Sequence, residues 1–121
     1  MAENEIDVSK YIGKSYADYD CYSLFLAIEK DLGHNLKNLR QSGKNKIERE
    51  KEIEAGKKDA QFEKIEKPVA GCAVIIYHND IPQHIGVYIG NGKVIHSTCD
   101  RGVIIEELRT LIVEGFYRVR T

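Results

Sequence analysis

The strongest constraint on the fold is a change in hydrophobic periodicity at Pro68. Before this residue the regular apolar positions recur at helical spacing, whereas after it they alternate with a period of two. The later segments are rich in Val, Ile and Tyr and are separated by Gly, Asn, Asp and Pro. We therefore expect strands at residues 72–77, 84–90, 93–98, 102–105 and 113–119, with a short helix or loop at 106–112.

One helix is predicted ahead of these strands. Asp20 can cap its N-terminus, and Gly33 is placed to end it. The apolar positions between them follow helical spacing and are Cys21, Leu24, Phe25, Ile28 and Leu32. A helix followed by a run of antiparallel strands is an α+β architecture. A chain of 121 residues suits one domain, so we expect a single domain over residues 1–121.

The stretch 44–67 has a different composition from the rest of the chain. It is dense in Lys and Glu, and its apolar residues are sparse. Mixed charge of this kind predicts an exposed helix or a mobile excursion. We favour a solvated segment, and a lid or a partner-binding role is the alternative.

Composition excludes several classes of protein. The formal net charge is −1, so the basic excess of a nucleic-acid-binding protein is absent. No apolar run approaches the roughly twenty residues of a membrane helix, so no membrane partner is expected. The N-terminus is acidic and is followed by no apolar core, so we expect synthesis in the cytosol. The cysteines form no Cys-x-x-Cys pair, and we expect neither a disulfide framework nor a metal or other cofactor.

Cys21 occupies a position with chemical consequences. A thiol in the first turn of a helix lies near the positive end of the helix dipole, which favours the thiolate. Backbone N–H groups at that end can also stabilise an oxyanion. A cysteine on an apolar helix face is more often a core residue than a nucleophile. A catalytic role for Cys21 therefore depends on a base nearby.

Two histidines in predicted strands are candidates for that role. A cysteine nucleophile needs an imidazole that takes its proton and a third group that orients the imidazole. His84 and His96 could fill these two places, since one histidine can accept a hydrogen bond from another. The alternatives are ordinary surface or core histidines, or metal binding together with His78, although no spacing requires a metal.

The turn between the two histidine strands decides whether they share a face. A plain two-residue loop at 91–92 would put His84 and His96 on opposite faces of the sheet. A three-residue loop at 90–92, or an equivalent bulge, pairs Gly86 with His96 and puts both histidines on one face. A catalytic pair therefore requires the odd loop or the bulge.

Taken in order, these segments resemble the NlpC-type cysteine peptidases, which are papain-like hydrolases of bacterial and phage origin. The resemblance is carried by Gly13-Lys-Ser-Tyr16, Asp20-Cys-Tyr-Ser-Leu24, His84-Ile-Gly-Val-Tyr-Ile-Gly-Asn-Gly92 and Val94-Ile-His96. With the closing Gly115-Phe-Tyr-Arg-Val119, the chain is most similar to the subgroup of phage tail-assembly proteins. The resemblance spans residues 11–119 except 44–67. It implies a papain-like fold in which the helix that carries the cysteine packs on an antiparallel sheet.

The resemblance also implies roles for individual residues. Cys21 would be the nucleophile, His84 the general base, and His96 the residue that orients His84. Tyr16 and Ser23 would lie on the oxyanion and substrate side of the site.

Asp20 would support the site as a cap of the helix. The chain departs from the family pattern at Gly71-Cys72, where members usually carry Gly-Asp, and in the short loop between Tyr16 and Cys21. Cys72 and Cys99 match no catalytic position. We expect Cys72 in the core and Cys99 on the surface.

The implied activity is hydrolysis of amide bonds in the peptide stems of peptidoglycan, with phage tail proteins as further partners and the virion tail as a second location. One alternative is a structural tail component with little activity of its own. Another is a cytosolic thiol amidase or acyltransferase that acts on a small γ-glutamyl or lipid substrate. The same residues would serve both kinds of enzyme.

Overall fold

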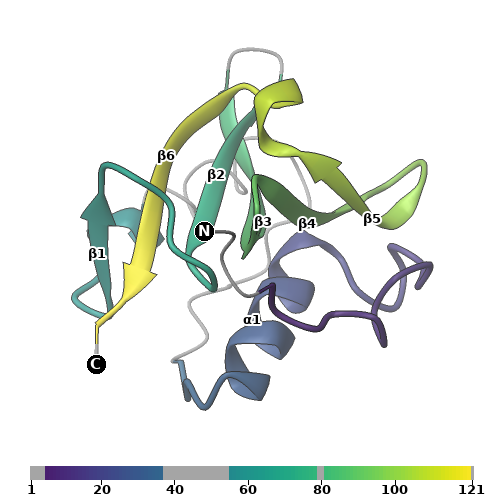
Figure 1. Ribbon diagram of the computed structural model, residues 1–121, viewed down its shortest axis with the longest axis horizontal. Helices are drawn as coiled ribbons and strands as arrows, with labels where there is room; N and C mark the ends of the chain where they lie inside the picture. Colours follow the sequence, from purple (N-terminus) through teal and green to yellow (C-terminus); the bar gives the residue numbers. More distant parts are fainter. Residues whose placement is uncertain (1–4, 37–54, 79–80, 121) are drawn as a thin grey trace.

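The computed structural model describes residues 5–36, 55–78 and 81–120. Its strands form one antiparallel sheet in the order β1-β6-β2-β3-β4-β5, and helix α1 packs on this sheet (Figure 1). This is the α+β architecture that the sequence predicts. The elements are α1 (Cys21–Asp31), β1 (Phe62–Ile65), β2 (Ala73–His78), β3 (Ile81–Gly90), β4 (Lys93–Thr98), β5 (Gly102–Glu107), the 3-10 turn η1 (Leu108–Thr110) and β6 (Val113–Val119).

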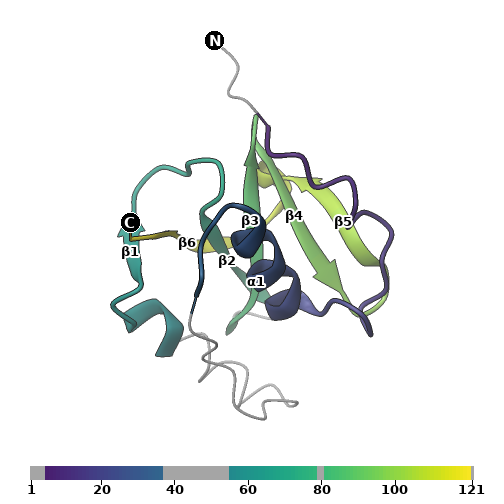
Figure 2. The ribbon, with the colours of Figure 1, turned by 90° about the horizontal axis from the view of Figure 1, so that it is seen from below.

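Helix α1 begins and ends where its local signals predict. The Asp20 carboxylate accepts a hydrogen bond from the Ser23 backbone N–H at 2.9 Å, so the predicted N-cap is confirmed. Gly33 follows the C-terminus with a φ of 89°, a conformation that favours glycine. The helix lies against β3 and β4 (Figure 2). No helix in the described parts of the chain is long and apolar enough to cross a membrane.

Both faces of the sheet carry buried apolar side chains. The face toward α1 contributes Ala73, Ile75, Val87, Ile89, Ile95, Val103 and Tyr117, which pack with Leu24, Phe25 and Ile28 of the helix. The opposite face buries Cys72, Val74, Ile76, Tyr88 and Val94, with residues of η1 and β6 packed on them. Strand β2 is therefore buried on both faces, which explains its continuous apolar run.

The prediction of an exposed helix or a mobile excursion over 44–67 is wrong at residues 62–65. Residues 44–54 lie outside the described part of the chain, and 55–58 are helical. Phe62–Ile65, however, forms strand β1 at the edge of the sheet and pairs with β6. The Phe62 ring lies 6.0 Å from that of Phe25, centroid to centroid, and Ile65 packs on the opposite face. Phe62 and Ile65 therefore lie in a strand because each packs against residues that are distant in the sequence.

Candidate active site

The hairpin between β3 and β4 sets the register of the two histidines. Asn91 and Gly92 have φ values of 52° and 73°, and Gly90 pairs with Lys93, so the loop has two residues. The register then shifts between Tyr88 and Gly90, which is a β-bulge. Of the two alternatives that put both histidines on one face, the structure contains the β-bulge and not the three-residue loop, and Gly86 pairs with His96.

The bulge brings the two imidazoles into contact. His84 Nε2 lies 2.8 Å from His96 Nδ1, and the ring planes meet at 71°. Gly86 lies between them, and a Cβ atom there would come within 2.8 Å of Val94 Cγ1 and 3.0 Å of the Ile95 carbonyl oxygen. Because a side chain at Gly86 would push β3 and β4 apart, glycine keeps the histidines within hydrogen-bond distance.

A carboxylate extends this contact onto a third strand. His96 Nε2 lies 3.0 Å from Glu106 Oε1, and Arg101 Nη2 lies 2.9 Å from the same oxygen. Glu106 belongs to β5, where it pairs with Val94, diagonal to His96. His84, His96 and Glu106, which we call the three-strand relay, therefore link β3, β4 and β5.

Glu106 is absent from the residues that the sequence analysis selects, because 106–112 is expected there as a short helix or loop. The structure extends β5 to Glu107 and places η1 after it. One signal could have found Glu106: it continues the alternation of β5 with Ile104, so it lies on the same face as His96.

His96 is the most enclosed member of the relay. Its side chain is 4% exposed, whereas that of Glu106 is 24% exposed. Burial lowers the pKa of the His96 imidazole from its ordinary value of 6.5, although the hydrogen bond and the charge of Glu106 oppose this shift. This shift favours the neutral ring, which carries one N–H, at neutral pH.

Cys21 is the first residue of α1 and is 8% exposed. The segment before it is tied to the histidine strand, since the Ser97 hydroxyl donates a hydrogen bond to the Tyr19 carbonyl. The helix therefore begins next to the residue that follows His96.

Along β3 and β4, the strands that α1 packs against, the two histidines alternate with the residues that face the helix. Alternation puts His84 and His96 on the face of Tyr88 and Val94, whereas Val87 and Ile95 face the helix. The contact between Cys21 Sγ and His84 is therefore a prediction that needs its own test.

The other selected residues lie around the start of α1. Tyr16 and Ser23 are half-buried, and the Ser23 backbone N–H is the group that Asp20 caps. Their roles on the substrate side stay predictions. Cys72 is buried and Cys99 is exposed, as expected.

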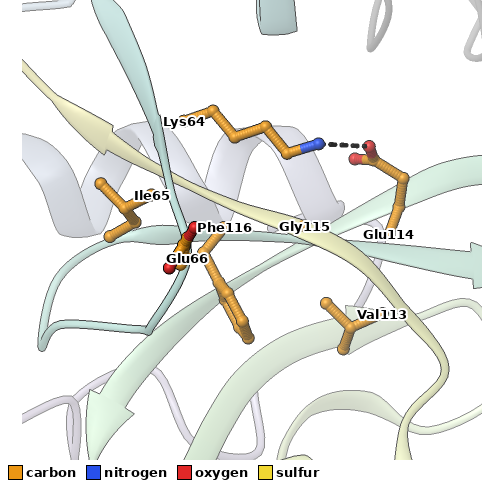
Figure 3. A pocket seen from close by; sticks show the side chains of 7 residues that line it. All are labelled: Lys64, Ile65, Glu66, Val113, Glu114, Gly115 and Phe116. Atoms are coloured by element: carbon orange, nitrogen blue, oxygen red, sulfur yellow. Dashed lines mark ion pairs between the residues drawn. The ribbon is translucent and has the colours of Figure 1, made fainter.

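A surface hollow lies elsewhere, between β1 and β6 (Figure 3). Lys64 Nζ lies 3.5 Å from Glu114 Oε1 at its rim. The full lining is Lys64, Ile65, Glu66, Val113, Glu114, Gly115 and Phe116. None of the selected catalytic residues lines this hollow. It is therefore a feature separate from the candidate active site.

Within the described residues, no group of three or more His, Cys, Asp or Glu side chains is placed to hold a metal ion. A search of curated proteins finds no match to the chain. The model of the NlpC/P60 family matches residues 8–119, which include α1, all six strands of the sheet and the three-strand relay.

Proposed function

Since the chain belongs to the NlpC/P60 family, whose members are generally cysteine peptidases and amidases that act on peptidoglycan, we propose that it hydrolyses amide bonds in peptidoglycan peptide stems through Cys21. The observation that carries the proposal is the hydrogen bond of 2.8 Å between His84 Nε2 and His96 Nδ1. It orients one imidazole through another, which is what a cysteine nucleophile requires of its base. The helix that begins at Cys21 supplies the nucleophile.

In the acylation step, the Cys21 thiol passes its proton to His84 and the thiolate attacks the carbonyl carbon of the scissile amide. The resulting oxyanion lies near backbone N–H groups at the start of α1, which stabilise it. As the tetrahedral intermediate collapses, the C–N bond breaks and His84 gives its proton to the leaving amine. The product is a thioester between Cys21 and the stem peptide.

In the deacylation step, His84 removes a proton from water, and the resulting hydroxide attacks the thioester carbonyl. The C–S bond breaks, the acid product leaves, and the proton returns to the Cys21 sulfur. His96 keeps the His84 ring in one orientation through both steps. The cycle consumes one water molecule and one amide bond.

We further propose that the enzyme works as part of a phage or phage-like tail and is made in the cytosol before it is built into the particle. The support is the Asp20-Cys-Tyr-Ser-Leu24 motif together with Gly115-Phe-Tyr-Arg-Val119, which resemble the tail-assembly subgroup. Co-purification with tail proteins encoded next to it tests this role. A chain that stays alone and hydrolyses cell wall without them would contradict it.

The activity itself is tested with Cys21→Ala. Purified sacculi are digested with the wild type and the variant, and the released peptides are separated and identified by mass. We expect loss of at least about 10³-fold of the hydrolysis, because the nucleophile is removed. Cys99→Ala, which changes an exposed cysteine, is the matched control and should keep wild-type activity. Undiminished hydrolysis by pure Cys21→Ala would end the proposal.

A further inference from the structure

Glu106 has no part in the mechanism above, yet its contacts constrain where the protons of the relay lie. An ionised carboxylate only accepts hydrogen bonds. Glu106 Oε1 lies 3.0 Å from His96 Nε2, so the proton of this hydrogen bond belongs to His96 Nε2. A neutral imidazole has a single N–H, and its other nitrogen is an acceptor. The contact with Glu106 therefore makes His96 Nδ1 an acceptor.

The second hydrogen bond of the relay then has only one direction. His96 Nδ1 accepts, so His84 Nε2, which lies 2.8 Å away, must donate its N–H. The remaining nitrogen of a neutral His84 ring, Nδ1, then holds a lone pair. A base that takes a proton from a thiol needs this lone pair.

We propose that Glu106 is a positioning residue that fixes the tautomers of both imidazoles and so makes Nδ1 of His84 the basic atom. This inference rests on the proposed function for its consequence in catalysis, but not for the tautomers themselves. Glu106 acts through its hydrogen bond to His96.

The surroundings of His96 support a neutral ring. The titratable and charged groups that face it are His84 from β3, Glu106 from β5 and Arg101 from the turn before β5. Its burial lowers the pKa of the imidazole, which keeps the second proton off the ring at neutral pH. A doubly protonated His96 would donate from both nitrogens and force His84 into the opposite tautomer.

Arg101 indicates how Glu106 acts. Its guanidinium donates to the same Oε1 atom that accepts from His96, so the charge of the carboxylate is already partly offset. What residue 106 must provide is therefore a hydrogen-bond acceptor for His96 Nε2, and a net negative charge matters less. A glutamine side chain keeps such an acceptor, whereas leucine removes it.

The direct test is NMR of the full chain labelled with ¹⁵N in the histidine rings, in which long-range ¹H–¹⁵N correlations identify the protonated nitrogen. At neutral pH we expect N–H at Nε2 of both His84 and His96. In Glu106→Leu the fixed pattern should be lost and His84 should acquire the Nδ1–H tautomer in part. Glu106→Gln should retain the wild-type pattern.

The matched control is the neighbouring Glu107, whose exposed side chain pairs with Arg109 rather than with His96. Glu107→Leu and Glu107→Gln should leave both tautomers unchanged. A wild-type His84 protonated at Nδ1, or unchanged tautomers in a folded Glu106→Leu, would overturn the inference. Because this readout needs no turnover, it is independent of whether the chain hydrolyses peptidoglycan.

The kinetic consequence follows if the chain hydrolyses peptidoglycan as proposed. Glu106→Leu should lower kcat by about 10- to 100-fold with little change in KM, a size typical of partners that orient a functional histidine. Glu106→Gln should restore most of kcat. An equal loss in both variants, with thermal unfolding showing both folded, would contradict a role as acceptor.

Discussion

At the scale of the residue, Gly86 decides how closely β3 and β4 approach. A Cβ atom at Gly86 would overlap Val94 and the Ile95 carbonyl. Gly86 pairs with His96 on β4. The sequence could predict that the two histidines share a face only if the hairpin held an odd loop or a bulge. It could not choose between these, since Gly90-Asn91-Gly92 is compatible with either. The sequence analysis missed Glu106 because it ended this strand at Ile105, whereas pairing with β4 extends the strand to Glu107.

Gly86→Ala should therefore damage the fold and the relay together. We expect the free energy of unfolding to fall by about 1–3 kcal/mol, the usual cost of overpacking a close contact. Urea unfolding measures this, and the histidine NMR pattern reports the relay. Gly115→Ala is the control, since a Cβ there meets the flexible end of Lys64 and the Tyr117 ring at 3.2 Å or more. Equal stability of the two variants would refute the close contact at Gly86.

At the scale of the element, α1 is determined by signals close together in the sequence, whereas β1 is determined by contacts with residues distant in the sequence. The helix was predictable because its cap, its apolar spacing and its terminating glycine are all close in the sequence. Strand β1 was not, because its four residues are half charged and become a strand only by pairing with β6 and by packing Phe62 on Phe25. Tertiary contacts override a weak local preference in this case.

Asp20→Ala should destabilise the start of α1. The Ser23 N–H loses its side-chain acceptor, and we expect a loss of about 0.5–2 kcal/mol in the free energy of unfolding. Asp20→Asn keeps an acceptor and should retain most of the stability. Asp18→Ala, at an exposed position before the helix, is the control. A loss no larger than that of Asp18→Ala, measured by urea unfolding, would show that the cap is unimportant.

At the scale of the whole molecule, three adjacent strands, joined by short connections, supply the relay, and the helix that carries Cys21 crosses two of them. The order β3-β4-β5 follows the chain, so hairpin reasoning from the sequence could place His84 beside His96. The pairing of β6 between β1 and β2 is long-range and has no local signal. The sequence therefore predicted the histidine pair better than the edge of the sheet.

Burial of His96 should make the stability of the whole fold depend on pH. Its pKa is lower in the folded chain than the ordinary 6.5, so the unfolded chain binds more protons as the pH falls through this value. The contribution of neutral His96 to the free energy of unfolding is fully present above pH 6.5. It is lost as the pH falls toward and through the pKa of His96 in the folded chain. Urea unfolding from pH 8 to pH 5 should show a steeper loss for the wild type than for His96→Asn. Parallel curves would contradict this prediction.

The central claim is that His84 takes the proton of Cys21, and the pH dependence of thiol alkylation tests it most directly. In a Cys99→Ala background two cysteines remain, Cys21 at 8% exposed and Cys72 at 1% exposed, and mass mapping of the alkylated peptides separates the iodoacetamide signal of Cys21 from that of Cys72. A thiolate paired with an imidazolium should react at a pH well below the ordinary cysteine pKa of about 8.5. We predict an alkylation midpoint for Cys21 well below that value, which returns toward it in His84→Ala. The same midpoint near the ordinary value in both proteins would contradict the account.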